Sequence, residues 1–289
     1  MVAARVQPSD PDTNLAPILI SVIVAVRNGA LTLQRCLDSI YEQTDPGWEV
    51  VVMDGASKDG TQAILISNAD RIAYWESEAD RGIAHAWNKA LDHAQGDWVL
   101  FLGADDSLHS ATTFADVAPL LRACPEDVDV AYGMIDVVNP DGTVRERAGK
   151  PWVEVRDDLT RGMTIPHPAT FHRRSLYGRV GRYDESYRIG SDYELLLRHL
   201  LSAEARFLDV VVTDMGAGGL SDRPSSRMQG ARETHRIRAS HGLTRTPEWR
   251  SGPVVKARLL VVTAGLLGAR RTERLRLAYS GVRGALRPR

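Results

Sequence analysis

The sequence is poor in cysteine, in aromatic residues and in long hydrophobic runs. Two cysteines in 289 residues make neither a disulfide framework nor a metal cluster, and a reducing compartment is the simpler interpretation. The apolar run nearest the C-terminus, 259–269, has 11 residues between basic side chains, whereas a membrane-spanning helix needs about 20. Residues 1–16 are polar and unlike a secretory signal. We therefore expect a cytoplasmic protein without a membrane span.

Several well-known catalytic motifs are missing as well. The chain has no G-x-S-x-G, no phosphate-binding loop with its lysine and no G-x-G-x-x-G, so hydrolase, kinase and dehydrogenase chemistry find no support. The eight histidines show no spacing typical of a zinc site. With 43% hydrophobic and 25% charged residues, the composition is that of an ordinary globular protein.

Charge is strongly separated along the chain. Residues 1–222 carry 20 basic and 34 acidic side chains, a net charge of −14, while residues 223–289 carry 16 and 3, a net charge of +13. A basic segment of this kind favours an anionic partner, which leaves a phospholipid surface, nucleic acid and the acidic body itself as candidates. We predict a flexible N-terminus over 1–16, an α/β domain over 17–222 and a basic helical extension over 223–289.

Strand and helix patterns alternate through the first half of the chain. Continuous apolar runs typical of strands buried on both faces occupy 18–26, 48–53 and 98–102, and helical spacing is found in 31–43, 61–70 and 83–94. This order predicts an α/β fold with a mostly parallel central sheet flanked by helices. In such sheets ligands bind beyond the carboxyl ends of the strands.

Acidic residues stand at two of these strand ends. Asp105 and Asp106 directly follow the third apolar run, and such hard oxygen ligands hold Mg²⁺ or Mn²⁺, which in turn binds a diphosphate that bare carboxylates repel. The alternative is that they only cap the next helix. Asp54 follows the second run, where it either accepts a hydrogen bond from a nucleobase or makes a plain turn.

Three further residues are candidates for the same site. Arg81 precedes a helix near the same edge, where it pairs either with phosphate or base oxygens or with a local acid. Asp192 opens a helix and is placed to act as a general base, although acids in a first turn are also favoured by the helix dipole alone. His167 lies between two prolines and either binds metal, phosphate or acceptor, or has a structural role.

Taken in order, these segments resemble glycosyltransferase family 2 with the GT-A fold. The resemblance rests on 22–28 (VIVAVRN), 51–61 (VVMDGASKDGT), 80–89 (DRGIAHAWNK), 97–106 (DWVLFLGADD), 167–171 (HPATF) and 191–194 (SDYE). It covers about residues 18–221. It implies a Rossmann-like GT-A sheet and an inverting transfer from a nucleotide-diphosphate sugar to a hydroxyl of a glycan, glycolipid or lipid-linked acceptor, assisted by Mg²⁺ or Mn²⁺.

The resemblance also implies roles for individual residues. By position, the nucleotide sugar would be contacted by Arg27, Asn28, Asp54, Arg81 and Asp105. Asp106 would contact the metal, Asp192 would be the general base, and His167 would lie near the reaction centre. Residues 218–221 resemble a mobile loop that closes over the donor. Gly55 departs from the family, which usually has a second acid there.

Two other functions remain open at this point. A nucleotidyltransferase would share the core and the acidic metal site, but residues 27–29 match its Gly-rich basic loop poorly. A non-catalytic nucleic-acid binder would use the basic extension, yet only Trp249 and Tyr279 supply aromatic rings there, which argues against nucleic acid as a partner. Residues 254–277 show an apolar helical face that fits either the inner, anionic surface of the membrane or packing on the acidic body.

Overall fold

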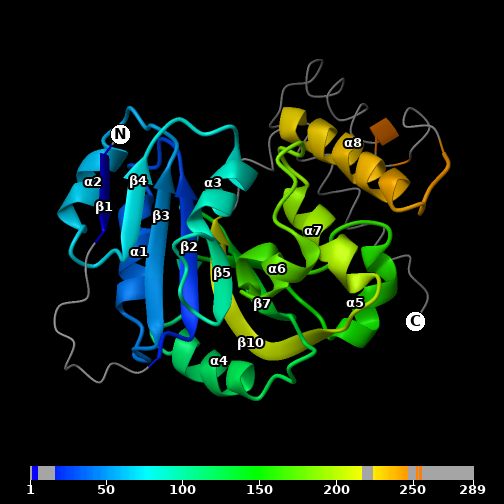
Figure 1. Cartoon of the computed structure of the whole chain (residues 1–289), viewed down its shortest axis with the longest axis horizontal. Helices are drawn as coiled ribbons and strands as arrows, with labels where there is room; N and C mark the ends of the chain where they lie inside the picture. The colour runs from blue at the N-terminus through cyan, green and yellow to red at the C-terminus, as the bar shows by residue number, and fades with distance from the viewer. Residues whose placement is uncertain (1, 6–16, 217–223, 247–251, 253, 256–289) are drawn as a thin grey trace. The chain divides into compact units, whose positions relative to one another are not determined.

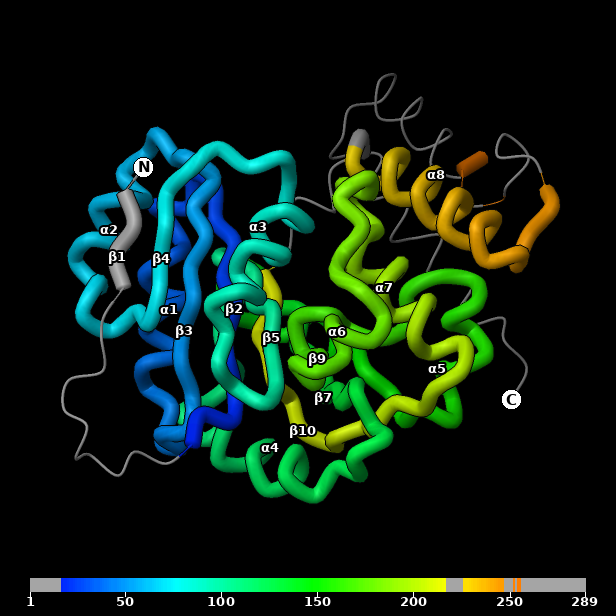
Figure 2. The backbone as a smooth tube through the Cα atoms, viewed as in Figure 1, coloured from blue at the N-terminus to red at the C-terminus, as the bar shows by residue number. Residues whose placement is uncertain are grey.

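The computed structural model describes residues 2–5, 17–216, 224–246, 252, 254 and 255 (Figure 1). The chain divides into two compact units, Met1–Ala217 and Gly218–Arg289. The first unit holds a large sheet with helices packed against it, and the second begins with one long helix (Figure 2). The predicted donor loop over 218–221 and the predicted apolar face over 254–277 lie, apart from 254 and 255, outside the described residues.

The described strands and helices follow the predicted alternation. The strands are β1 (Val2–Arg5), β2 (Ile20–Val26), β3 (Trp48–Asp54), β4 (Tyr74–Ser77), β5 (Trp98–Gly103), β6 (Ser107–Leu108), β7 (Val130–Val138), β8 (Val144–Ala148), β9 (Thr170–Arg173) and β10 (Ala205–Gly216). The helices are α1 (Leu33–Tyr41), α2 (Thr61–Ser67), α3 (Ile83–Ala90), α4 (Thr113–Arg122), α5 (Trp152–Leu159), α6 (Leu176–Val180), α7 (Ser191–Leu200) and α8 (Pro224–Ser240), with a short 3₁₀ helix η1 (His167–Ala169).

The strands form one mixed sheet in the order β1-β4-β3-β2-β5-β9-β7-β10-β6, with β8 beside β7. Strands β4, β3, β2 and β5 run parallel, and so do β7 and β10. Strand β9 lies between the two parallel groups and is antiparallel to both of its neighbours. The α/β fold with a mostly parallel centre is therefore confirmed, while the edge strand β1 and the central strand β9 were not among the predicted strands.

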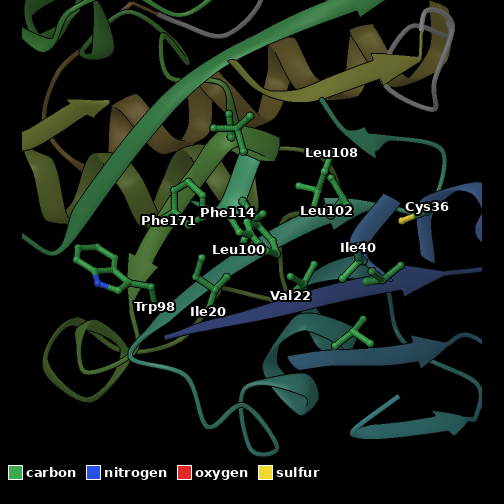
Figure 3. Packing of buried hydrophobic residues seen from close by; sticks show 14 of the residues in the cluster. Ile20, Val22, Cys36, Ile40, Trp98, Leu100, Leu102, Leu108, Phe114 and Phe171 are labelled. Atoms are coloured by element: carbon green, nitrogen blue, oxygen red, sulfur yellow. The ribbon is translucent and has the colours of Figure 1, made fainter. Parts of the chain in front are cut away.

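Both faces of the parallel strands are buried. Val22 of β2 packs with Cys36 and Ile40 of α1 in one hydrophobic cluster (Figure 3). Val24 belongs to the same cluster, whereas Ile23 between them packs in a second cluster with α3. The same alternation holds along β3 and β5. Full burial of one such side chain stabilises the fold by about 1.5–3 kcal/mol. With helices on both faces, the strands need apolar side chains at every position, and polar residues are confined to the strand ends.

The second unit contributes helix α8. Its 17 residues include four arginines. The basic character predicted for this segment is therefore carried by a regular helix. Among the residues that the structure describes, no helix is long and apolar enough to cross a membrane.

Two histidines are buried in the short helix η1 and in the strand β9 that follows it. His172 of β9 is fully buried, and neither of its ring nitrogens has a hydrogen-bond partner. Burial, and to a lesser degree the neighbouring His167 and His199, lowers the pKa of His172 well below its usual value. Burial also lowers the pKa of His167 to about 3. Both rings are therefore neutral in the folded protein at neutral pH.

We expect the free energy of unfolding to fall as the pH drops below about 6.5, because these two histidines take up protons only when the chain unfolds. Each contributes up to about 1.4 kcal/mol per pH unit between its unfolded and folded pKa. Asp106 acts with the opposite sign, because its pKa is raised in the folded state to about 7.

His172→Phe tests this expectation, because it removes one buried proton acceptor and keeps an aromatic ring. Urea unfolding at pH 8 and pH 5 should show a smaller loss of stability on acidification than in the wild type. Comparing the two pH values within one variant cancels any change in packing. Equal losses in both proteins would contradict the assignment of His172.

Candidate functional site

Asp54, at the carboxyl end of β3, is almost fully buried and is hydrogen-bonded on both carboxylate oxygens. It accepts hydrogen bonds from the backbone N–H of Ser57 at 3.1 and 3.3 Å and from the Ser57 hydroxyl. The Ser77 hydroxyl at the end of β4 donates to it at 2.5 Å. Asp54 thus ties the loop after β3 to the end of β4, and its contact with a nucleobase stays a prediction.

Gly55 leaves room for a carboxylate that comes from another loop. A Cβ atom at this position would collide with Oδ2 of Asp80 and would lie 3.4 Å from Cδ of Arg27. The other oxygen of Asp80 accepts a hydrogen bond from the backbone N–H of Gly82 at 2.9 Å. The second acid that is missing at position 55 therefore has a neighbouring counterpart in Asp80, the residue before Arg81.

Asn28 joins the first two loops of the site. Its backbone N–H donates to the Ser57 hydroxyl at 2.7 Å, and its side-chain oxygen accepts from the backbone N–H of Lys58 at 2.9 Å. Asn28 has a φ of 54°, a left-handed conformation that asparagine tolerates better than most residues. Arg27 beside it is exposed at the same edge. Both residues are thus at the predicted edge, and Asn28 also holds its loops together.

Arg81 is bound to an acid from a distant part of the chain. Its guanidinium contacts Oε2 of Glu185 at 2.6 and 3.1 Å, and the Arg81 side chain is 70% exposed. Glu185 also accepts a hydrogen bond from the Asn88 side chain at 3.3 Å. An ion pair this exposed contributes little to stability. Arg81 therefore lies against the loop that precedes α7, where a phosphate or base oxygen would compete with Glu185 for it.

The acidic pair after β5 converges on one small space. A Cβ atom at Gly103 would lie 3.0 Å from Oδ1 of Asp105 and 2.6 Å from Oδ2 of Asp106, so both carboxylates turn back over this glycine. Asp106 is 5% exposed and accepts a hydrogen bond from the backbone N–H of Gly216, at the end of β10, at 3.2 Å. Burial, followed by the charge of Asp105, raises the pKa of Asp106 to about 7.

This arrangement fits a hard divalent cation. Within the described part of the chain, the carboxylate of Asp105 makes no hydrogen bond or ion pair, and that of Asp106 is contacted by backbone groups of Gly216 and Gly103 and by no basic side chain. Two converging acids, one of them buried, lose their mutual repulsion when a cation with oxygen ligands lies between them. The residues present therefore suit Mg²⁺ or Mn²⁺ at the place that the sequence analysis predicted.

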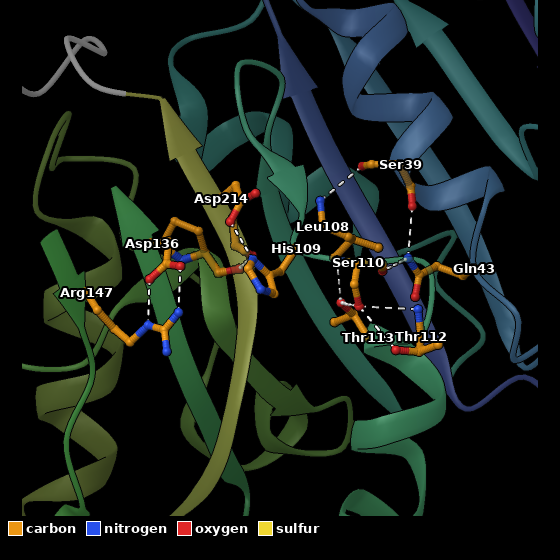
Figure 4. A network of polar contacts seen from close by, with 12 residues as sticks. Ser39, Gln43, Leu108, His109, Ser110, Thr112, Thr113, Asp136, Arg147 and Asp214 are labelled. Atoms are coloured by element: carbon orange, nitrogen blue, oxygen red, sulfur yellow. Dashed lines mark hydrogen bonds and ion pairs between the residues drawn. The ribbon is translucent and has the colours of Figure 1, made fainter. Parts of the chain in front are cut away.

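A second group of possible metal ligands lies on neighbouring strands. One ligand atom each from His109, Asp136 and Asp214 fall within 4.8 Å of one another (Figure 4). Asp136 and Asp214 are paired in register on β7 and β10, so their charges face each other. However, Arg147 binds both oxygens of Asp136 at 2.7 and 2.8 Å, and His109 Nδ1 lies 2.7 Å from Asp214. Asp136 and Asp214 are therefore already bound by side chains of the protein, whereas no basic side chain binds Asp105 or Asp106 in the described part of the chain.

Asp192 lies half-buried in the first turn of α7. Its Oδ1 accepts a hydrogen bond from the backbone N–H of Tyr193 at 2.7 Å. Its charge contributes, after burial and Tyr177, to raising the pKa of Tyr183 well above the usual value. Glu194, two residues along, is paired with Arg198 at 2.8 and 3.0 Å. The nearest acid in sequence to Asp192 therefore has its own counter-charge.

His167 packs in a cluster of aromatic side chains. Its ring centroid lies 4.9 Å from that of Trp87 and 5.5 Å from that of Phe101, and its Nε2 lies 3.2 Å from the hydroxyl of Tyr183. Since Phe101 belongs to β5, the same strand leads to the acidic pair and supports His167. Sequence reasoning missed Tyr183, because a single tyrosine in a loop carries no recognisable pattern.

A cavity of about 660 Å³ lies away from these residues. It is lined by Asp127, Val128, Trp152, Arg156, Asp157, Thr160, Leu200, Leu201, Ser202, Ala203 and Glu204. Asp127 and Val128 precede β7, and Ala203 and Glu204 precede β10, so the cavity lies at the amino ends of these strands. The predicted site residues are at the opposite, carboxyl ends, and the cavity does not belong to their site.

Mn²⁺ binding distinguishes the two groups of acids. We expect Asp106→Asn to weaken Mn²⁺ binding at least about 10-fold, because it removes a ligand charge at the converging pair. Asp214→Asn is the matched control and should leave the affinity within about twofold. Electron paramagnetic resonance of free Mn²⁺, recorded with a nucleoside diphosphate present, measures both. Loss of binding in Asp214→Asn with normal binding in Asp106→Asn would place the ion at the second group instead.

Comparison with known proteins identifies related sequences. The family model described as glycosyl transferase family 2 matches residues 21–182. A PGL/p-HBAD biosynthesis glycosyltransferase of Mycobacterium bovis is 35% identical over 214 residues, which are 72% of this chain and 81% of that protein. An uncharacterized glycosyltransferase of Mycobacterium tuberculosis is 32% identical over 214 residues, 73% of this chain and 80% of that protein.

Solved structures share the fold. The mannosyltransferase PcManGT from Pyrobaculum calidifontis, in complex with GDP-Man and Mn²⁺, has a TM-score of 0.59 at 21% identity over 93% of this chain and 83% of that one. TarS 1-349 of S. aureus, in complex with UDP-GlcNAc, has a TM-score of 0.58 at 20% identity over 76% of this chain and 66% of that one. The sheet and its flanking helices are those of GT-A glycosyltransferases. The chain is thus a member of glycosyl transferase family 2.

Proposed function

We propose that this enzyme is an inverting, metal-assisted glycosyltransferase. It moves a sugar from a nucleotide-diphosphate sugar to a hydroxyl of a glycan, glycolipid or lipid-linked acceptor. The observation that carries the proposal is the pair Asp105 and Asp106, which converge over Gly103 without a basic side chain bound to either carboxylate in the described part of the chain. The complexes of GDP-Man with PcManGT and of UDP-GlcNAc with TarS support a donor of this class.

In this proposal, the acidic pair and Arg81 bind different parts of the donor. Asp105 and Asp106 would hold a divalent cation, and Arg81 would exchange Glu185 for a donor oxygen. The cation, when bound, stabilises the negative charge that grows on the departing diphosphate. Arg27 and Asp54, with Asn28 bracing their loops, line the edge at which the nucleoside would lie.

Asp192 is the proposed general base. The acceptor oxygen attacks the anomeric carbon from the face opposite the diphosphate, the bond from sugar to diphosphate breaks, and Asp192 takes the hydroxyl proton. Attack from the opposite face inverts the configuration at this carbon. The N-terminus of α7 favours the negative charge of Asp192, and the charge of nearby Glu194 is balanced by Arg198.

The general base is tested by replacement. Asp192→Asn keeps the size of the side chain and removes the proton acceptor, so we expect transfer to fall by about 10²–10⁴-fold with the thermal midpoint nearly unchanged. Glu194→Gln, in the same helical turn, is the control and should retain transfer. The assay measures release of the nucleoside diphosphate with acceptor present. An active, purified Asp192→Asn enzyme would remove Asp192 from this role.

The donor can be identified by its effect on stability. A ligand that binds only the native state raises the apparent unfolding temperature. We expect one of UDP, GDP and dTDP to raise it in the presence of Mn²⁺ and to have a smaller effect without the ion. Asp106→Asn should abolish the difference made by Mn²⁺. A panel in which no nucleotide changes the midpoint would contradict the proposed donor class.

The basic extension is proposed to bring the enzyme to the inner surface of the membrane as a peripheral protein. Its net charge of +13 supports attraction to anionic lipid. We expect the full chain to float with vesicles that contain anionic phospholipid, and a chain lacking residues 250–289 to float less. Equal flotation of the two proteins would defeat this part of the proposal and favour the extension as a partner of the acidic body.

A further inference from the structure

Tyr183 is held in one position by contacts on three sides. Its backbone N–H donates to the side-chain oxygen of Asn88 at 3.1 Å, and the Asn88 amide donates back to the Tyr183 carbonyl at 2.9 Å. Its ring, which is 3% exposed, lies with its centroid 4.9 Å from that of Trp87 and 5.2 Å from that of Phe101. Both the main chain and the ring of Tyr183 are therefore fixed, and only the hydroxyl is left to interact with other polar groups.

The hydroxyl of Tyr183 meets two groups. It lies 3.2 Å from Nε2 of His167 and 3.4 Å from the hydroxyl of Tyr177. The closer contact is with the imidazole, whose ring is further clamped by Trp87 and Phe101. A histidine that binds through one nitrogen has its ring orientation, and the role of the other nitrogen, set by that bond.

The second nitrogen of His167 is differently placed. Within the described residues, Nδ1 of His167 has no hydrogen-bond partner, whereas Nε2 lies 3.2 Å from the Tyr183 hydroxyl. His167 is thus a buried ring with one nitrogen held inside the protein and a second nitrogen that makes no hydrogen bond there. Arg198 of α7 donates to the carbonyl of Arg182 at 2.9 Å, so the helix that Asp192 opens is bound to the residue before Tyr183.

We propose that Tyr183 is a positioning residue for sugar transfer. Its hydroxyl holds Nε2 of His167, so that Nδ1 of the imidazole is presented to the hydroxyl of the acceptor whose proton Asp192 takes. This inference rests on the proposed function and deepens it, because it assigns a fixed hydrogen-bonding group to the acceptor side. His167 then orients the acceptor oxygen, and Tyr183 acts only through His167.

The test removes the hydroxyl and keeps the ring. Tyr183→Phe retains the packing on Trp87 and Phe101 but leaves Nε2 of His167 without its partner. We expect kcat to fall about tenfold, the size expected for one misplaced hydrogen bond, while KM for the donor stays within about twofold. In two-bond ¹H–¹⁵N spectra, the nitrogen shifts of His167 should move, because its tautomer is no longer fixed by the tyrosine.

Tyr177→Phe is the matched control. It removes the other hydroxyl of the same buried cluster, which contacts Tyr183 but not the His167 ring, so kcat and the His167 nitrogen shifts should both stay close to the wild-type values. Equal losses of kcat in the two variants would overturn the inference, because general packing would then explain them.

Two further results would also overturn the role of Tyr183. These are an unchanged kcat in Tyr183→Phe, and His167 nitrogen shifts that do not move. A wild-type protein that transfers no sugar would instead refute the proposed function itself. An active wild type with an equally active Tyr183→Phe variant refutes only the role of Tyr183, so the two failures are distinguishable.

Discussion

The site depends on two carboxylates that are forced together at the end of a buried strand. Strand β5 is apolar along its length because both of its faces are covered, so the first polar residues it can present are those beyond its carboxyl end. There Gly103 allows the chain to fold back, and Asp105 and Asp106 point into the same space. A cation held there would relieve this repulsion, and under the proposed function it would allow the acidic body of the protein to bind an anionic diphosphate.

The same strand also links the donor side to the acceptor side. Phe101 packs against His167, His167 contacts Tyr183, and Arg198 of α7 binds the carbonyl of Arg182 next to Tyr183. Strand β10 makes a second link, because Gly216 near its end binds Asp106 and the hydroxyl of Thr213 binds the carbonyl of Pro168 at 2.7 Å. Residues far apart in the sequence are thus held together by two strands of one rigid sheet.

The comparison of the two acidic groups shows why proximity alone does not define a metal site. His109, Asp136 and Asp214 are close enough to share an ion, but Arg147 already binds Asp136 and His109 already contacts Asp214. Asp136 is also buried, so leaving it without Arg147 would be costly. A stable internal network and a ligand site therefore differ in whether the acids have partners, which becomes visible only once the strands are paired.

Some elements could be predicted because their signal is local. The apolar runs that became β2, β3 and β5 and the acids that follow them needed only the alternation of burial and turn residues along the chain. Strands β1 and β9 were missed because each has four residues and owes its conformation to its neighbours in the sheet. The short 83–90 helix was predicted to run four residues further, because a helical pattern does not mark the turn at which the backbone leaves the helix.

The sequence by itself determined the fold class and the candidate residues, because burial on both faces restricts polar residues to the strand ends. Only the tertiary structure decided which of these residues have partners. Asp54 and Asn28 proved to be bound by neighbouring loops, the carboxylate of Asp105 proved to make no hydrogen bond or ion pair with the described residues, and Tyr183 proved to contact His167. Such contacts join segments that are distant along the chain, and no pattern within one segment records them.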